Sequence, residues 1–323
     1  MTVDQERVSA VVPTYQRAHL IADALDSVAG QTWRPFEIVV VDDGSTDGTK
    51  DAVAAWAAAH PDIPVRFLWQ ENAGGNAARN AGIAAARGAF VAFLDSDDTW
   101  DATKTEKQMA VFSDPGIGAV YCGLRETEAE TGKTLHEPPL SAPDAATLAR
   151  LLVRDETGPT SAWIVRKTVL QAVGGFDPDL RARQDWDLWI RLAAQTRIAS
   201  VPERLFSLRH HGGPRTASDP TRELRAYRAI RAKNATLLAK HPLPVRLAAR
   251  AAFHRRSGRV RLRYMGQRWR ALGHYGVAIA LWPVEPDSWF AFLGWFMPSG
   301  LRQGLRKVWN RTIGRGGLGI RSH

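Results

Sequence analysis

The sequence is poor in cysteine and in long apolar runs, and each shortage excludes a class of protein. Cys122 is the only cysteine among 323 residues, so no internal disulfide can form and a disulfide scaffold is excluded. In the C-terminal part, the longest stretches without Lys, Arg, Asp or Glu span 271–284 and 288–301, each 14 residues long. A membrane-spanning helix needs about 18 apolar residues or more, and both stretches also contain proline.

The N-terminus lacks the pattern of an export signal, and several catalytic motifs are missing. Asp4 and Glu6 precede Arg7, and the first apolar run, 8–12, is only as long as a strand, which is wrong for a signal peptide. No G-x-G-x-x-G follows the first predicted strand, and no G-x-x-x-x-G-K-[ST], C-x-x-C, H-E-x-x-H or G-x-S-x-G occurs. These absences count against a dinucleotide fingerprint, a phosphate loop of that kind, a zinc site and a nucleophile elbow. We therefore expect a cytoplasmic protein.

Charge is distributed unequally along a chain that otherwise has the composition of a folded protein. Hydrophobic residues make up 45% and charged residues 24%, which is typical of a globular domain. Residues 222–323 hold 21 Lys and Arg against 3 Asp and Glu, a net of +18, whereas residues 1–221 hold 22 against 30, a net of −8. The sequence therefore predicts an acidic module followed by a basic one.

Strand-like and helix-like segments alternate through the first half of the chain. The predicted strands span 7–12, 37–41, 65–69, 89–94, 118–122 and 161–165, and the predicted helices span 18–29, 47–60, 74–87, 103–112, 145–153 and 186–194. This alternation predicts an α/β fold with a mostly parallel, doubly wound sheet. From Thr221 onward the pattern is helical and basic, and it is interrupted by prolines.

Acidic residues follow two of the predicted strands. The second strand leads into the run 42–47, Asp-Asp-Gly-Ser-Thr-Asp, and the fourth leads into 95–98, Asp-Ser-Asp-Asp. In open α/β sheets, ligands bind at the carboxyl ends of strands. Three carboxylates within four residues repel one another, so a bound cation is expected there, and oxygen ligands favour Mg²⁺ or Mn²⁺. The first run alone is equally compatible with a turn that caps a helix.

Six sequence blocks occur in an order that is specific to one family. They are VVPTY at 11–15, VDDGSTDG at 41–48, NAGGNAARNAGI at 72–83, FLDSDDTW at 93–100, GGFD at 174–177 and QDWDLWIRLA at 184–193. In these blocks, over roughly residues 7–215, the chain resembles the family 2 glycosyltransferases of the GT-A fold. The resemblance implies a metal-dependent inverting transfer of a sugar from a nucleotide-diphosphate sugar to a hydroxyl acceptor. It also implies a role in cell-surface glycan or glycolipid assembly.

The resemblance implies a nucleotide-sugar site made by these blocks. Its expected residues are Pro13 and Tyr15 at the base pocket, Asp43 on the base N3–H, Arg79 facing the base or phosphates, and Asp95 and Ser96 near the ribose. An N3–H is offered by uracil and thymine, so a UDP- or dTDP-type donor is expected. Two alternatives stay open, because Tyr15 also fits a core aromatic and Arg79 also fits a solvated helix arginine.

The resemblance also implies metal ligands and a catalytic base. Asp97 is expected to bind Mg²⁺ or Mn²⁺, which neutralises the departing diphosphate as a Lewis acid. His211 fits a further metal ligand better than the adjacent His210, although the pair leaves the choice open. Asp185 matches the base that takes the proton of the acceptor hydroxyl in a single, inverting displacement, and Gln184 stands where relatives often have Glu. The alternative for Asp185 is a cap on a helix beginning at residue 186.

The basic tail lies outside the six blocks. Arginines recur at 222, 225, 228 and 231, a second cluster occupies 255–263, and aromatic residues are interleaved over 269–296. Basic residues with aromatic ones suit the interface of an anionic membrane. They also suit packing on the acidic module or on a second subunit, whereas nucleic acid is the least favoured partner. We predict a catalytic domain at 1–220 and a basic helical C-terminal extension at 221–323, peripheral at the inner face of the cell membrane.

Two other functions compete with glycosyl transfer. A nucleotidyltransferase also uses a nucleotide, a metal and aspartates, but it commonly needs a basic glycine-rich loop after the first strand, which is missing here. A catalytically silent glycan-binding or scaffold protein of the same fold is the other alternative. The joint presence of Asp43, Asp97 and Asp185 favours an active enzyme.

Overall fold

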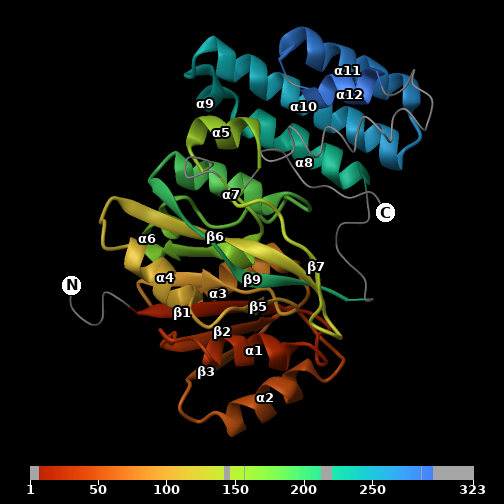
Figure 1. Cartoon of the computed structure of the whole chain (residues 1–323). Coiled ribbons are helices and arrows are strands. Elements are labelled where there is room, and N and C mark those ends of the chain that lie inside the picture. The colour runs from red at the N-terminus through yellow and green to blue at the C-terminus, as the bar shows by residue number, and fades with distance from the viewer. Residues whose placement is uncertain (1–6, 142–145, 156, 212–219, 285, 294–323) are drawn as a thin grey trace. The chain divides into compact units, whose positions relative to one another are not determined.

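The computed structural model describes residues 7–141, 146–155, 157–211, 220–284 and 286–293 (Figure 1). The chain divides into two compact units. The first unit comprises 1–147, 157–179 and 184–213, and the second comprises 148–156, 180–183 and 214–323. The second unit therefore includes two short stretches that precede the basic tail in the sequence.

The first unit is built on one curled, mixed sheet. Its strands are β1 Val8–Thr14, β2 Glu37–Asp42, β3 Val65–Trp69, β4 Phe90–Phe93, β5 Thr99–Trp100, β6 Ile117–Glu128, β7 Thr134–His136, β8 Trp163–Arg166 and β9 Arg197–His210. Among the described residues they follow the order β3-β2-β1-β4-β8-β6-β9-β5, with β7 on β6. Strands β3, β2, β1 and β4 are parallel, as expected from the α/β alternation. Beyond β4 the pairing is mixed, because β8 runs antiparallel to both β4 and β6.

Most helices of the first unit lie where the sequence predicts them, but the sequence analysis predicts none at 167–172. In the first unit they are α1 Ile21–Ala29, α2 Thr49–Ala59, α3 Gly75–Ala85, α4 Lys104–Val111, α6 Lys167–Ala172 and α7 Gln184–Ala193, with a 3₁₀ turn at Thr160–Ala162. Helix α1 shows the cause, because Ile21, Ala24, Leu25 and Val28 recur at helical spacing and all are buried. The α/β fold class of the sequence prediction is confirmed, and α7 begins at Gln184, two residues earlier than expected.

A close contact between α3 and β1 fixes the position of α3. Every residue of β1 is buried, and Gly82 of α3 lies directly over it. A Cβ on Gly82 would fall 2.3 Å from Cγ1 of Val11, a distance that no side chain can occupy. The absence of a side chain at residue 82 thus lets the helix approach the strand closely. Because Arg79 lies one turn earlier on α3, this contact also fixes the distance of Arg79 from the sheet.

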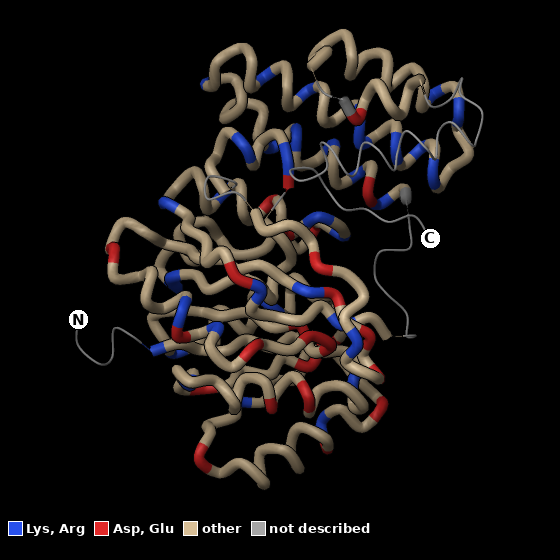
Figure 2. Tube along the Cα trace, viewed as in Figure 1, with Lys and Arg blue, Asp and Glu red and all other residues tan. Residues whose placement is uncertain are grey.

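The second unit is helical, as the sequence pattern predicts. Its helices are α5 Leu148–Val153, α8 Pro220–Lys233, α9 Ala235–Ala239, α10 Leu243–Tyr264, α11 Arg268–Leu281 and α12 Pro286–Leu293. Helices α10 and α11 approach closely at Gly258, where a Cβ would lie 3.2 Å from the carbonyl oxygen of Ala271. Lys and Arg recur along α8 and α10 (Figure 2). In the described part of the chain, no helix is both long enough and apolar enough to cross a bilayer.

Candidate active site

Three loops of the first unit meet at the carboxyl ends of β1, β2 and β4. Thr14, the last residue of β1, pairs with Asp42, the last residue of β2, and Val11 pairs with Phe93, the last residue of β4. Because the three strands are parallel neighbours, the residues that follow them gather at one edge of the sheet. These residues are 15–18, 43–48 and 94–98, and they include most of the site residues predicted from the sequence.

Asp43 is buried, and it organises the loop that leads into α3. Its carboxylate accepts hydrogen bonds from Nε2 of Gln70 at 2.7 Å and from the backbone N–H groups of Ala73 at 2.9 Å and Gly74 at 2.8 Å. A carboxylate has about four acceptor positions, so it retains capacity for one further donor. The run 42–47 is also a structured turn, because Ser45 donates to Asp42 and the N–H of Ala18 donates to Asp47.

Tyr15 is exposed where β1 ends, which makes the core-aromatic alternative wrong. Its side chain is 47% exposed, whereas Pro13 lies within the buried strand. The next residue, Gln16, has a positive φ of 55°. The Gln16 N–H donates to Oγ of Ser45 at 2.8 Å, and this bond holds the chain in that uncommon conformation.

Arg79 is buried against an aspartate, which makes the solvated-arginine alternative wrong. Its Nη2 donates to Oδ1 of Asp95 at 2.5 Å, and its guanidinium lies over the Phe176 ring at 5.5 Å from the centroid. Thr160 donates to the other carboxylate oxygen of Asp95 at 3.3 Å. The pair therefore presents one cationic and one anionic group side by side at the end of β4.

Asp97 is accompanied by two cationic or imidazole side chains. Nε2 of His211 lies 3.1 Å from Oδ2 of Asp97, and Nη2 of Arg17 lies 3.6 Å from the same oxygen. The neighbouring His210 belongs to β9, and its Nε2 lies 2.8 Å from Oε2 of Glu126. The structure thus brings His211, and not His210, to Asp97.

Ser96 and Asp98 are more buried than their neighbours Asp95 and Asp97. Both are buried, and Asp98 accepts hydrogen bonds from Oγ of Ser161 at 2.6 Å and from the N–H of Arg209 at 3.2 Å. Burial, followed by the charges of Asp95 and Asp97, raises the pKa of Asp98 well above its usual value. The sequence analysis assigns no separate role to Asp98, and the structure shows that it connects the loop after β4 to β9.

The donor set at Asp97 fits a divalent cation that is bound together with a substrate. Among the described residues, no group of three or more His, Cys, Asp or Glu side chains is arranged to hold a metal by itself. Mg²⁺ and similar ions commonly use only one or two carboxylates, and they complete their shell with water and substrate phosphates. Asp97 with His211 is a set of that size, and the side chain of Asp97 is 28% exposed.

Asp185 lies in the first turn of α7 and is half-buried. Because α7 begins at Gln184, Asp185 is inside the helix, although its Oδ1 accepts a hydrogen bond from the N–H of Trp186 at 2.8 Å. Asp187 is fully buried and pairs with Arg191, whose Nη1 donates to the carbonyl oxygens of Val173 and Gly175 at 2.7 Å. The QDWDLWIRLA block therefore anchors the GGFD block.

The structure adds two asparagines that sequence reasoning missed. The side-chain amide of Asn80 donates to the carbonyl of Phe176 and accepts from its N–H, both at 2.8 Å. One turn earlier, Asn76 donates to the carbonyl of Asp177 at 2.8 Å. Asn76 and Asn80 are four residues apart on α3, so their shared helix face is the signal in the sequence that points to a common partner.

Several curated relatives are glycosyltransferases. The chain is 30% identical over 217 residues to an uncharacterized glycosyltransferase of Rickettsia felis, and the match covers 67% of this chain but only 35% of that protein. It is 33% identical over 192 residues to the putative teichuronic acid biosynthesis glycosyltransferase TuaG of Bacillus subtilis, covering 59% of this chain and 74% of TuaG. It is 30% identical over 202 residues to WfgD of Escherichia coli, a UDP-Glc:alpha-D-GlcNAc-diphosphoundecaprenol beta-1,3-glucosyltransferase, covering 62% of this chain and 74% of WfgD.

Solved structures share the fold at low sequence identity. Staphylococcus aureus TarS 1–349 in complex with UDP-GlcNAc gives a TM-score of 0.60 at 21% identity, covering 92% of each chain. The mannosyltransferase PcManGT of Pyrobaculum calidifontis, in complex with GDP-Man and Mn²⁺, gives 0.58 at 23% identity, covering 96% of this chain and 84% of PcManGT. The sequence model of glycosyl transferase family 2 matches residues 9–174, more than half of the chain. Together with the blocks gathered at the sheet edge, this match shows that the chain belongs to glycosyl transferase family 2.

Proposed function

We propose that the chain is a metal-dependent inverting glycosyltransferase that uses a nucleotide-diphosphate sugar. The observation that carries the proposal is the meeting of Asp97 with His211 and Arg17 beside the Arg79–Asp95 pair. An anionic metal ligand next to two buried or half-buried guanidiniums suits a diphosphate that arrives with a divalent cation. The fold neighbours that bind UDP-GlcNAc or GDP-Man with Mn²⁺ support the same class of donor.

In this proposal the donor lies across the carboxyl ends of β1, β2 and β4. Tyr15 stacks on the base, and Asp43 offers its remaining acceptor capacity to the N3–H of uracil or thymine. Arg79 and Arg17 face the phosphates, while Asp95 and Ser96 border the ribose. Asp97 and His211 hold Mg²⁺ or Mn²⁺, which when bound neutralises the charge that develops on the departing diphosphate.

Asp185 is the proposed catalytic base. It takes the proton of the acceptor hydroxyl as that oxygen attacks the anomeric carbon, and the carbon–oxygen bond to the diphosphate breaks on the opposite face. One displacement of this kind inverts the anomeric configuration. The buried Asp187–Arg191 pair, at 2.9 Å, holds α7 against the GGFD loop and so positions the turn that carries Asp185.

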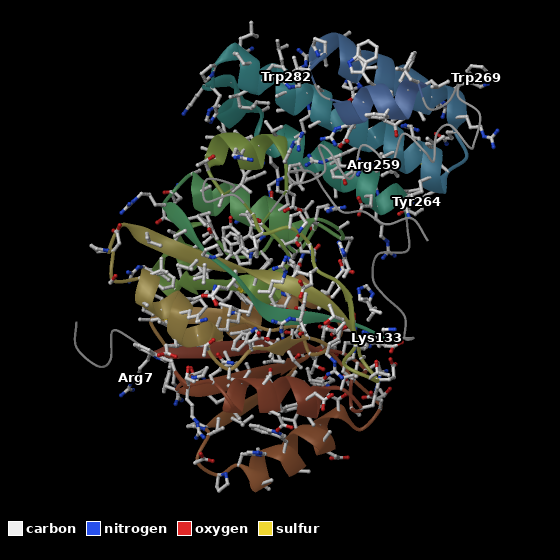
Figure 3. The ribbon with its side chains drawn as sticks, in the orientation of Figure 1. Arg7, Lys133, Arg259, Tyr264, Trp269 and Trp282 are labelled. Carbon is white, nitrogen blue, oxygen red and sulfur yellow. The ribbon has the colours of Figure 1, made fainter. Side chains whose placement is uncertain are left out.

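The proposed acceptor is a saccharide or a lipid-linked saccharide of the cell surface. This proposal is supported by the names of two relatives. TuaG, at 33% identity, is named for teichuronic acid biosynthesis, and WfgD, at 30%, is named for a diphosphoundecaprenol-linked GlcNAc acceptor. We assign catalysis to residues 1–220 and a peripheral contact with the inner face of the cell membrane to 221–323. Large apolar side chains on the helical unit support that contact, since Tyr264 is 60% and Trp269 is 80% exposed (Figure 3).

Release of nucleoside diphosphate tests the proposal. The full-length chain is incubated with UDP- and dTDP-sugars and a panel of lipid-linked saccharides, with Mn²⁺ and with a chelator. We expect Mn²⁺-dependent release of UDP or dTDP that requires the acceptor. Release of pyrophosphate would instead support the nucleotidyltransferase alternative, and donor binding without any turnover across the panel would support the silent glycan-binding alternative.

A further inference from the structure

Two histidines of the helical unit form a pair that the proposed transfer reaction does not use. His254 lies on α10 and His274 on α11, and their Nδ1 atoms are 3.1 Å apart. On the far side of the pair, Nε of Arg261 lies 3.2 Å from Nε2 of His274. The three side chains therefore form a continuous line of hydrogen bonds within the second unit.

The direction of this line follows from the chemistry of arginine. A guanidinium has only donors, so Nε2 of His274 must be the acceptor of the bond from Arg261. The proton of neutral His274 is then on Nδ1, and it is donated to Nδ1 of His254. His254 in turn carries its own proton on Nε2, where none of the described residues accepts it. The line thus ends in an N–H donor polarised by a guanidinium at its other end.

Arginines of α8 and α10 place positive charge near the histidine pair. Arg250 lies one turn before His254 on α10, and the guanidinium of Arg231 on α8 lies 4.8 Å from the ring centroid of Phe253, the residue next to His254. The charges of Arg231 and Arg250 act on His254, and those of Arg261 and Arg228 act on His274. Burial, followed by the charges of His274, Arg231 and Arg250, lowers the pKa of His254 to about 4. Both imidazoles are therefore neutral near pH 7, which is the protonation state that the hydrogen-bond line requires.

Among the residues that the structure describes, no carboxylate pairs with Arg231 or Arg250. Glu223 and Asp287, the acidic residues of 222–323 that the structure describes, pair with Arg183 at 3.3 Å and with Arg255 at 3.2 Å. Within the described part of the chain, neither Arg231 nor Arg250 forms an ion pair, and Arg250 is exposed. Two imidazoles this close would suit a transition metal by spacing alone, but four guanidiniums with no compensating acid repel a cation.

We propose that Arg231, Arg250 and the Nε2–H of His254 form a binding site for a phosphate group. Two guanidiniums and one neutral N–H supply donors to several oxygens of a phosphate, and a doubly charged anion gains most from an uncompensated positive field. The site uses none of the residues assigned to the nucleotide-sugar, so it is a second anion site in the chain. The phosphate belongs either to the headgroup of an anionic lipid or to a soluble phosphorylated compound.

The first experiment titrates the full-length protein with inorganic phosphate while the imidazole signals are followed by NMR. Because protonated His254 binds an anion more tightly, bound phosphate raises the pKa of His254 above about 4. We expect Arg250→Gln and Arg231→Gln each to weaken phosphate binding by about tenfold. Arg270→Gln is the matched control, because Arg270 is an exposed arginine of α11 and is not among the charges that shift the pKa of either histidine. Its effect should stay within about twofold.

The outcomes decide between a site and a diffuse charge effect. Equal weakening by Arg250→Gln and Arg270→Gln, or an unchanged His254 pKa at saturating phosphate, overturns the proposal. Arg250 is exposed, so its substitution leaves packing intact, and circular dichroism checks the fold of each variant. The Arg231→Gln variant gives an independent reading of the same site.

A second experiment separates the two sources of phosphate. Full-length protein is sedimented with phosphatidylglycerol vesicles and, in parallel, with phosphatidylcholine vesicles, and the Arg250→Gln and Arg270→Gln variants are compared. Retention on phosphatidylglycerol that Arg250→Gln lowers more than Arg270→Gln, and that pyrophosphate reverses, supports the site with a lipid as its source. Tight pyrophosphate binding with no vesicle retention supports the site with a soluble source.

Discussion

The two units of the chain gather charge in opposite ways. In the first, the carboxylates at the sheet edge have cationic or imidazole neighbours of their own, such as Arg79 with Asp95 and His211 with Asp97. In the second, Arg231 and Arg250 have no acidic partner among the described residues. In our proposals, the balanced charge of the first unit receives a diphosphate that arrives with a cation, whereas the unbalanced charge of the second unit receives a phosphate group alone. The net charge of +10 of the whole chain does not reveal this difference between its two units.

The largest expected effect is a loss of turnover when the proposed catalytic base of the first unit, Asp185, is replaced. Asp185→Asn keeps the shape of the side chain but cannot accept a proton, so the turnover number should fall by about 10²–10⁴-fold with little change in donor affinity. Steady-state kinetics with an acceptor that supports turnover in the panel assay measures both quantities. Asp51→Asn, at an exposed acid in the first turn of α2, is the control. Near wild-type turnover in Asp185→Asn would reduce Asp185 to a helix-terminal residue.

The next largest effect is expected when the carboxylate that lies beside His211 is removed. Asp97→Ala deletes the oxygen 3.1 Å from His211, so Mn²⁺-dependent binding of UDP or dTDP should weaken by about 100-fold. Because Asp97 is in a loop at the end of β4, the melting temperature should hardly change. Calorimetric titration with and without Mn²⁺ measures the loss, and Asp62→Ala, at an exposed surface pair with Arg34, is the control. Unchanged affinity would rule out Asp97 as a metal ligand.

A stability test addresses the contact between Gly82 of α3 and Val11 of β1, which positions Arg79 relative to the sheet. Gly82→Ala introduces a Cβ that would lie 2.3 Å from Val11, and overpacking of this kind should cost about 1–3 kcal/mol. Donor binding should weaken as well, because α3 carries Arg79. Urea denaturation measures the first effect and calorimetry the second. A variant as stable as the parent would mean that α3 has room to move away from β1.

A pH test concerns the buried cation in the core of the first unit. Lys104 is fully buried over the Trp100 ring, 4.3 Å from the centroid, and burial lowers its pKa to about 8. Since the unfolded chain holds that proton up to about 10.4, the unfolded state binds more protons between these values. Lys104 should therefore make the free energy of unfolding increase as the pH rises from about 8 to about 10.4. Lys104→Met should remove this slope, and a persistent slope in urea denaturation would assign it to another group.

The smallest effect is expected at Gly273, a helical glycine of the second unit that can be compared with Gly82. Gly273 lies within α11, and a Cβ built there meets nothing within 4 Å. Gly273→Ala should therefore stabilise the protein by about 0.5–1 kcal/mol through helix propensity and a less flexible unfolded chain. The same substitution thus has opposite signs at two helical glycines. Destabilisation at Gly273 would show that α11 is covered there by another part of the molecule.

The sequence predicts most of the parallel half of the sheet, because buried strands leave continuous apolar runs. Strand β2 is the clearest case, since all six of its residues are buried. Strand β9 was not predicted, because Arg197–His210 mixes charged and apolar residues along a half-buried strand. Its main partner, β6, lies far away in the sequence, so no local pattern reports the pairing.

The candidate site shows the same division between local and distant information. The positions of Asp43, Asp95 and Asp97 at strand ends follow from the local pattern, and the structure confirms those positions. The partners do not follow from it, because Arg79 and Asp95 meet across 16 residues and Asp97 and His211 across 114. The choice between His210 and His211 also needs the structure, because their partners, Glu126 and Asp97, lie 84 and 114 residues away.

The three hydrogen bonds that Asp43 accepts bear on any attempt to redesign donor preference. Gln70, Ala73 and Gly74 all depend on this one carboxylate, so a substitution at Asp43 would release the loop that begins α3 along with any contact to a base. Loss of activity there would say little about which base is read. Tyr15 is the better position for a library, because its exposed ring can be exchanged without disturbing the sheet beneath it.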